Sequence, residues 1–270
     1  MSFLEKNFLD IRNLDILARQ TSWVHRVDPR AKVFTTLVYI LMVVSVDKYA
    51  IAQLVPFLIF PVVLIGAGNL PLGYFLKKIA LVAPFAILLG IFNPLVDRTI
   101  LLHIGSLGVS GGWISFISLM LRFGLTVAGA LILIAVTGFN GICLALLQFR
   151  VPRVFVTQLL FLYRYLFVLI DEACRMARAR LLRALDARAP RLQTFTSMLG
   201  YLLLRATARA ERIHLAMCCR GYDGNVRLMT SSNFQLSDVL FVTSWTSLFV
   251  LFRMYDMPQL LGAKALEVLL

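Results

Sequence analysis

The 270-residue sequence is 60% hydrophobic and only 15% charged, with a mean hydropathy of +0.83. This composition excludes an ordinary water-soluble protein, because a soluble surface needs many more charged side chains. The net charge is +13, but the sequence has no nucleic-acid-binding motif, so we expect no nucleic-acid partner. We attribute the charge to the lysines and arginines that gather in the cytosolic loops of membrane proteins.

The N-terminal segment, residues 1–32, carries acidic and basic residues before any long apolar run. This arrangement is unlike a cleavable signal peptide, which has a short basic start followed at once by an apolar stretch. The apolar positions from Leu4 to Ala18 have near-helical spacing. They are compatible with an amphipathic helix at the membrane interface or with a plain packing helix.

Six apolar runs are candidates for membrane crossings, since a helix needs roughly 20 apolar residues to span the hydrocarbon core. In chain order they are Val33 to Val46, Ala50 to Ala67, Ile79 to Val96, Trp113 to Phe139, Val154 to Ile170 and Leu236 to Phe252.

Basic residues assign the sides of the membrane. Ten of them share one side if the first four runs all cross: Lys6, Arg12, Arg19, Arg26, Arg30, Lys32, Lys77, Lys78, Arg150 and Arg153. Only Lys48 and Arg98 fall on the other side. The positive-inside rule therefore predicts a cytosolic N-terminus and a chain that returns to the cytosol after four crossings.

The fifth run conflicts with this rule if it also crosses. It would place residues 171–235, with their eleven arginines, outside the cell. We therefore predict that Val154 to Ile170 packs along the bundle or near the cytosolic interface without completing a crossing, and that Arg164 within it reaches the headgroups or pairs locally. Five crossings follow, with the C-terminus outside.

These observations predict an all-α integral membrane protein with about five transmembrane helices and additional cytosolic or interfacial helices. The expected organisation is an N-terminal interfacial segment (1–32), a four-helix transmembrane region (33–139), a cytosolic helical region (140–235), and a final transmembrane helix with the C-terminus (236–270).

Two helices are predicted in the cytosolic region. The first runs from Asp171 to Arg188 and stops before Pro190, which lacks an amide hydrogen. The second runs from about Phe195 to Arg220, with Gly221 as the residue that ends it in a left-handed conformation. Arginines on such helices are compatible with a surface that faces anionic lipid, but the many alanine, leucine and methionine residues favour a protein groove.

The sequence contains no recognisable catalytic constellation. His25, His103 and His214 are far apart, no metal-binding spacing is present, and no phosphate-binding loop of the GxxxxGK[ST] type occurs. We therefore expect no catalytic residues, no metal site and no cofactor in this chain. Arg122, in the fourth predicted crossing, is interpreted as a packing or interface charge rather than a substrate ligand.

Several motifs occur in a characteristic order. They are Asp28-Pro29-Arg30-Ala31-Lys32, Val151-Pro152, Tyr163-Arg164-Tyr165, Asp171-Glu172-Ala173, Arg209-Ala210-Glu211-Arg212, and the run from Ala216 to Gly224. In this order and spacing the chain resembles, over nearly its whole length, the transmembrane T component of energy-coupling factor (ECF) transporters, and within them the cobalt-type CbiQ family.

The resemblance implies two short Ala-Arg-Gly-like signatures that dock into two ATPase subunits. The second signature corresponds to Cys219, Arg220 and Gly221, with Cys219 in place of the usual alanine. The first corresponds to Leu182, Arg183 and Ala184, and a rival placement is Ala187, Arg188 and Ala189. Neither placement of the first signature has the glycine.

The resemblance also implies a function. The chain would be a non-catalytic coupling subunit of an importer in the plasma membrane of a prokaryote, and the importer would take up cobalt ions. Its expected partners are two ATPase subunits that bind ATP and Mg²⁺, a substrate-binding membrane S component, and the lipid bilayer. The alternatives are an independent channel or carrier, which would transport without ATP, and an intramembrane enzyme, which would need a catalytic constellation.

Overall fold

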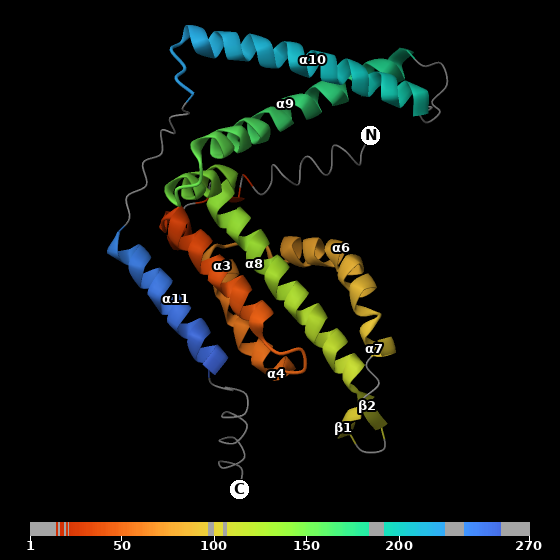
Figure 1. The fold of residues 1–270 in the computed structure, drawn as a ribbon, viewed down its shortest axis with the longest axis vertical. Helices are drawn as coiled ribbons and strands as arrows, with labels where there is room; N and C mark the ends of the chain where they lie inside the picture. Colours follow the sequence, from red (N-terminus) through yellow and green to blue (C-terminus); the bar gives the residue numbers. More distant parts are fainter. Residues whose placement is uncertain are drawn as a thin grey trace. The chain divides into compact units, whose positions relative to one another are not determined.

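A computed structural model of the chain describes residues 15, 17–18, 20, 22–96, 100–104, 107–183, 192–224 and 235–254. Its contacts divide the chain into two compact units. One unit contains Leu9–Ala145 and Ser232–Leu270, and the other contains Met1–Phe8 and Leu146–Ser231. Figure 1 shows that helices make up most of the described chain in both units, which confirms the predicted all-α class.

The first unit contains most of the apolar helices and one small hairpin. In chain order its elements are α2 (Trp23–Arg26), α3 (Pro29–Ser45), α4 (Ile51–Leu54), the 3-10 helix η1 (Val55–Leu58), α5 (Ile59–Ala67), α6 (Leu72–Gly90), α7 (Asn93–Val96), β1 (Ile100–Ile104), β2 (Leu107–Ser110), α8 (Gly111–Gln148) and α11 (Leu236–Met254). The second unit contains α9 (Arg153–Arg183) and α10 (Leu192–Cys219).

Four of the described helices are long and apolar enough to cross a membrane, judged by length and composition. They are α6, α8, α9 and α11, and the segment Ile51–Ala67 is a shorter apolar helix. The helices α3, α6, α8 and α11 and the Ile51–Ala67 segment overlap the five runs predicted to cross. Helix α9 contains the run from Val154 to Ile170, and its failure to complete a crossing stays a prediction.

Two helix boundaries differ from the sequence-based expectation. Helix α6 begins at Leu72, directly after Pro71, so Lys77 and Lys78 lie within its first turns and not in a connection. Helix α9 continues without a break through Asp171, so the apolar run and the first charged helix are one element that ends at Arg183. The prediction of a separate helix beginning at Asp171 is wrong, because a change from apolar to charged side chains does not interrupt backbone hydrogen bonding.

The antiparallel hairpin of β1 and β2 is the one described element outside the predicted helical class. Ile100 pairs with Ser110 and Ile104 with Leu107 across the two strands.

Helix α8 is longer than a crossing requires and is interrupted near its C-terminal end. Gly138 has φ 69° and ψ 160°, which is not helical and which favours glycine. The break falls one residue before Phe139, the end of the predicted crossing. The break in α8 therefore coincides with the end of the apolar run that was predicted to cross.

Aromatic side chains form the core of the first unit. Tyr39 of α3 is fully buried, with ring centroids 4.5 Å from Phe60 and 5.4 Å from Phe249 of α11. The Tyr39 hydroxyl donates a hydrogen bond of 3.2 Å to the Phe57 carbonyl. This bond satisfies the one polar atom of Tyr39 within a large apolar contact between the segment 51–67, α3 and α11.

A buried polar cluster joins the N-terminal ends of α3 and α11. Asp238 is 3% exposed, and its two carboxylate oxygens accept hydrogen bonds from the backbone amides of Asp28, at 2.9 Å, and Gln235, at 2.8 Å. Lys32 donates to the carbonyls of His25, at 3.2 Å, and Val136, at 3.4 Å. Val136 lies just before the break at Gly138, so Lys32 provides a partner for a carbonyl beside the interrupted part of α8.

Candidate functional site

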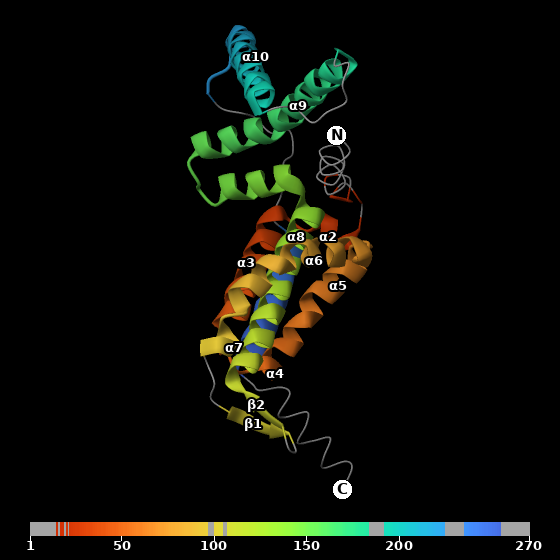
Figure 2. The same ribbon diagram turned by 90° about the vertical axis from the view of Figure 1, so that its right-hand side faces the viewer.

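The candidate site is built on the two helices of the second unit, α9 and α10. Helix α10 runs back across α9, and the two helices cross each other, as Figures 1 and 2 show. The C-terminal residue of α9 is Arg183, and Arg220 directly follows the last residue of α10. The helix ends that carry these two arginines extend away from the crossing in different directions (Figures 1 and 2).

The end of α10 has the hydrogen bonds of a Schellman motif. The Tyr222 amide donates to the Met217 carbonyl at 3.0 Å, and the Gly221 amide donates to the Cys218 carbonyl at 3.0 Å. Gly221 has φ 78°, in the left-handed region that glycine adopts without steric cost. The expectation that Gly221 ends this helix is therefore confirmed, and the motif fixes the backbone on both sides of Arg220.

The Arg220 side chain is presented to the surroundings. Cys219, Arg220 and Gly221 are all exposed, and Arg220 has no ion pair within the described part of the chain. An exposed guanidinium carries five N–H donors in a planar fork, which matches the two oxygens of a carboxylate. The end of α10 can therefore dock to a carboxylate on a partner without first breaking an ion pair to a described residue.

The first predicted signature is described only in part. Leu182 is 89% exposed and Arg183 is exposed, both in the last turn of α9. Ala184 and the three residues of the rival placement, Ala187, Arg188 and Ala189, lie outside the described residues. The choice between the two placements stays open.

One carboxylate connects the two helices at their crossing. Glu172 of α9 accepts hydrogen bonds from Arg205 at 2.5 Å and Arg209 at 3.5 Å, both on α10, and from Arg175 at 3.1 Å on its own helix. The Glu172 side chain is only 13% exposed, whereas that of Arg205 is 61% exposed. The guanidiniums thus screen the carboxylate from the surroundings.

Sequence reasoning found only part of this cluster. Helical spacing by itself pairs Glu172 with Arg175, because residues three apart in a helix are neighbours. The bonds to Arg205 and Arg209 were missed, since no local rule pairs residues on different helices. The available signal was the spacing of Arg205 and Arg209, which puts them one turn apart on one face of α10.

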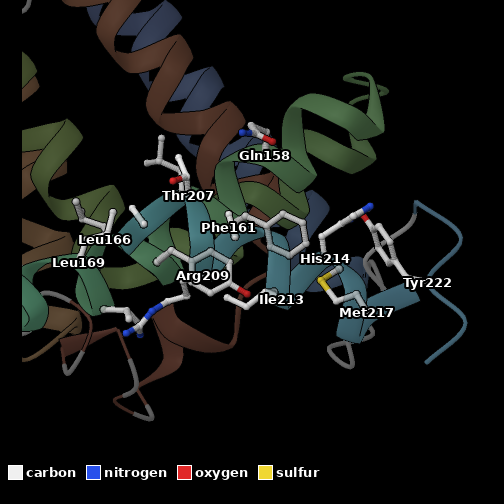
Figure 3. Close-up of a pocket in the computed structure, with 15 residues that line it drawn as sticks. Gln158, Phe161, Leu166, Leu169, Thr207, Arg209, Ile213, His214, Met217 and Tyr222 are labelled. Carbon is white, nitrogen blue, oxygen red and sulfur yellow. The ribbon is translucent and has the colours of Figure 1, made fainter. Parts of the chain in front are cut away.

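An apolar groove of about 720 Å³ lies between α9 and α10. Its lining includes Phe161 and Leu166 of α9 and Ala210 and Ile213 of α10. Figure 3 shows Arg209 towards one end of the groove and His214, Met217 and Tyr222 towards the other. The two helices therefore present an open apolar surface between their charged ends.

The described residues contain no group of three or more His, Cys, Asp or Glu side chains that could hold a metal ion. Within the same residues, Arg122 of α8 has two buried side-chain nitrogens, Nε and Nη2, without a hydrogen-bond partner. Its role as a packing or interface charge stays a prediction.

Comparisons with known proteins support the resemblance seen in the motifs. The family model CbiQ, described as cobalt transport protein, matches residues 20–232. The energy-coupling factor transporter transmembrane protein EcfT of Listeria innocua is 26% identical over 219 residues, covering 75% of this chain and 82% of that protein. The cobalt transport protein CbiQ of Rhodobacter capsulatus is 27% identical over 228 residues, covering 83% of this chain and 89% of that protein.

The matched region includes the crossed helices and the signature at the end of α10, as well as most of the apolar helices of the first unit. The apolar helices and the membrane transporters among its relatives are together consistent with a multi-pass membrane protein. The chain belongs to the CbiQ family, the transmembrane T components of energy-coupling factor transporters.

Proposed function

We propose that this chain is the non-catalytic coupling subunit of an ECF-type importer that takes up cobalt ions. It transmits the ATP-driven motion of two ATPase subunits to a substrate-binding membrane subunit. ATP and Mg²⁺ are bound by the ATPase subunits, and this chain needs no cofactor of its own. The observation that carries the proposal is the pair of exposed arginines, Arg183 and Arg220, at the separate ends of two crossed helices.

The docking chemistry follows from the guanidinium group. A carboxylate in a groove of an ATPase subunit accepts two parallel hydrogen bonds from such a group, and removal of one member of a buried charged pair costs about 2–5 kcal/mol. The Schellman motif holds the Arg220 backbone in place, so little conformational freedom is lost on docking. Each of the two arginines then anchors one ATPase subunit.

The transmission step uses the stiffness of the helices. ATP binding that closes two ATPase subunits moves the anchored helix ends towards each other, and the crossed helices carry that motion to the membrane. The cobalt assignment rests on the names of the matching family model and of the Rhodobacter capsulatus relative. The ATPases require a cytosolic position for α9 and α10, in agreement with the charge-based orientation in a prokaryotic plasma membrane.

The test is Arg220→Glu in the chain co-expressed with its ATPase and substrate-binding subunits. We expect normal membrane insertion, loss of ATPase co-purification and loss of ATP-driven uptake of radioactive cobalt. The matched control is Arg178→Glu, which makes the same charge change at an exposed position of α9, five residues before Arg183. Co-purification and uptake of the Arg220→Glu protein at the level of the control would refute the docking role.

The first anchor is identified by comparing Arg183→Glu with Arg188→Glu. The variant that separates ATP hydrolysis from uptake marks the anchor. Cobalt uptake by the purified chain in vesicles without ATPase subunits would instead support an independent channel or carrier.

A further inference from the structure

The contacts of Glu172 single it out among the acidic residues of the second unit. Its Oε1 accepts from Arg205 and its Oε2 accepts from Arg209, so each oxygen is bonded to a different turn of α10. Arg175 adds a third guanidinium from α9 itself. A lone exposed ion pair contributes little to a structure, but a shared carboxylate with low exposure forms a network in which each bond restricts the others.

This network fixes two degrees of freedom of the helix pair. Arg205 and Arg209 are separated by about 6 Å along the α10 axis, the rise of four helical residues. Sliding of α10 along α9 moves both guanidiniums past the carboxylate, and rotation of α10 swings both off the facing side. Either movement breaks at least one of the two bonds.

Small side chains of α10 lie beside the charged cluster, whereas large ones such as Phe161 and Ile213 line other parts of the groove. The small ones are Ala206, three residues before Arg209, and Ala210, which directly follows it. Large interdigitating side chains fix a helix crossing by ridges-into-grooves packing, and small side chains beside an open groove leave it free to shift. Beside these two alanines the charged cluster therefore supplies a restraint on the position of α10 that the local packing does not.

We propose that Glu172 is a positioning residue of the transporter: by binding Arg205 and Arg209 it fixes the crossing of α9 and α10, and thereby the spacing of the two ATPase anchors. This role rests on the proposed coupling function. Glu172 contacts neither nucleotide nor substrate, and it acts through the placement of Arg183 and Arg220. Its loss leaves both anchors intact but makes the connection between them loose.

The experiment compares Glu172→Gln with Glu211→Gln in the complete transporter reconstituted in lipid vesicles. Glu211 is the matched control because it is an exposed glutamate on α10 with no ion pair among the described residues. The readouts are ATPase co-purification, ATP hydrolysis, and cobalt uptake per ATP hydrolysed.

Spin labels at Leu181→Cys on α9 and Leu215→Cys on α10, both exposed positions, report the distance across the crossing. Cys174, Cys218 and Cys219 are replaced by alanine, and the buried Cys143 is kept.

We expect the Glu172→Gln protein to keep its ATPase subunits and its ATP hydrolysis. The distribution of label distances should broaden, and cobalt uptake per ATP should fall by about tenfold, a factor that lies within the usual range of coupling between two sites. Glu172→Asp, which keeps the charge, should restore part of both losses. If Glu172→Gln fails to accumulate, the double variant Arg205→Gln/Arg209→Gln removes the α10 side of the cluster and gives the same test.

A distance distribution and coupling ratio equal to those of Glu211→Gln would overturn the positioning role. This failure differs from failure of the proposed function. If only the positioning role is wrong, Arg220→Glu still releases the ATPase subunits. If the coupling function is wrong, Arg220→Glu leaves them bound.

Discussion

Gly221 shows how one residue can control the presentation of its neighbour. Its φ is 78°, and a Cβ atom added there would meet no other atom within 4 Å. The cost of Gly221→Ala is therefore conformational and not steric, about 1 kcal/mol for a left-handed residue with a side chain. We expect this variant to loosen the end of α10 and to weaken ATPase co-purification, with normal membrane insertion.

Gly224→Ala is the matched control for that variant. Gly224 has φ 84° and equally open surroundings, but it lies beyond the hydrogen bonds that end α10. Equal losses of co-purification in both glycine variants would contradict a specific role for the helix end.

His25 gives a prediction about pH. Its Nδ1 lies 2.7 Å from the Ser22 hydroxyl and its Nε2 lies 3.1 Å from the Leu17 carbonyl. Burial first, and the charge of Lys32 second, lower the pKa of His25 below its ordinary value of 6.5. The unfolded chain therefore binds the proton more readily, so stability is present above 6.5 and is lost as the pH falls through that value towards the folded pKa.

Thermal unfolding in detergent checks this prediction. The unfolding temperature should fall between about pH 7.5 and pH 5.5, the range in which histidine titrates. His25→Gln should show a smaller fall, because glutamine carries no titrating group. An identical pH dependence in the two proteins would show that other groups cause the change.

Residue-scale features differ in how well the sequence predicts them. Gly221 was predicted because the end of a helix depends on a few neighbouring residues and on the left-handed conformation that glycine tolerates. The three-arginine environment of Glu172 was not predicted. Its partners are 33 and 37 residues away, and only the crossing of α9 and α10 brings them together.

At the scale of elements, the contact between the N-terminal ends of α3 and α11 is expected to stabilise the first unit. Asp238→Asn keeps one oxygen acceptor and replaces the other by an NH₂ donor, which leaves one of the two buried amides, of Asp28 or Gln235, without a partner. Such a loss costs about 1–3 kcal/mol. The unfolding temperature in detergent should fall, whereas Asp171→Asn, the same change at an exposed position, should have little effect.

The existence of the long helices could be predicted, but some of their limits could not. An apolar run marks only the part of a helix that is excluded from water. Helices α6 and α9 both extend beyond their apolar runs into charged sequence, so the runs do not give their ends. Lys77 and Lys78 lie on early turns of α6, where long side chains reach away from the apolar part. The β1–β2 hairpin was missed because its short apolar strands come soon after the third apolar run and gave no separate signal.

At the scale of the whole molecule, the distribution of basic residues gives a topology that labelling can test. In single-cysteine variants, Lys48→Cys should react with a membrane-impermeant maleimide on intact cells, because Lys48 is expected outside. Arg178→Cys should react only after the membrane is permeabilised. The reverse pattern would place α9 and α10 outside the cell, away from ATP, and would refute the coupling function.

The family could be predicted from the sequence because its motifs are spread along the chain in a fixed order, from Asp28 to Gly224. The identity of the transported ion has no such signal in this chain. Within the described residues no metal-ligand group is present, and the proposed substrate pocket belongs to a different subunit.

The bond from the Asp28 amide to Asp238 joins residues that are 210 positions apart. A ribosome adds about 5–20 residues per second, so roughly 10–40 s separate the synthesis of the two partners. During that interval α3 has already left the ribosome, but the carboxylate that binds its first turn does not yet exist. The contact between α3 and α11 therefore forms late, and the first unit completes its assembly only after Asp238 has been synthesised.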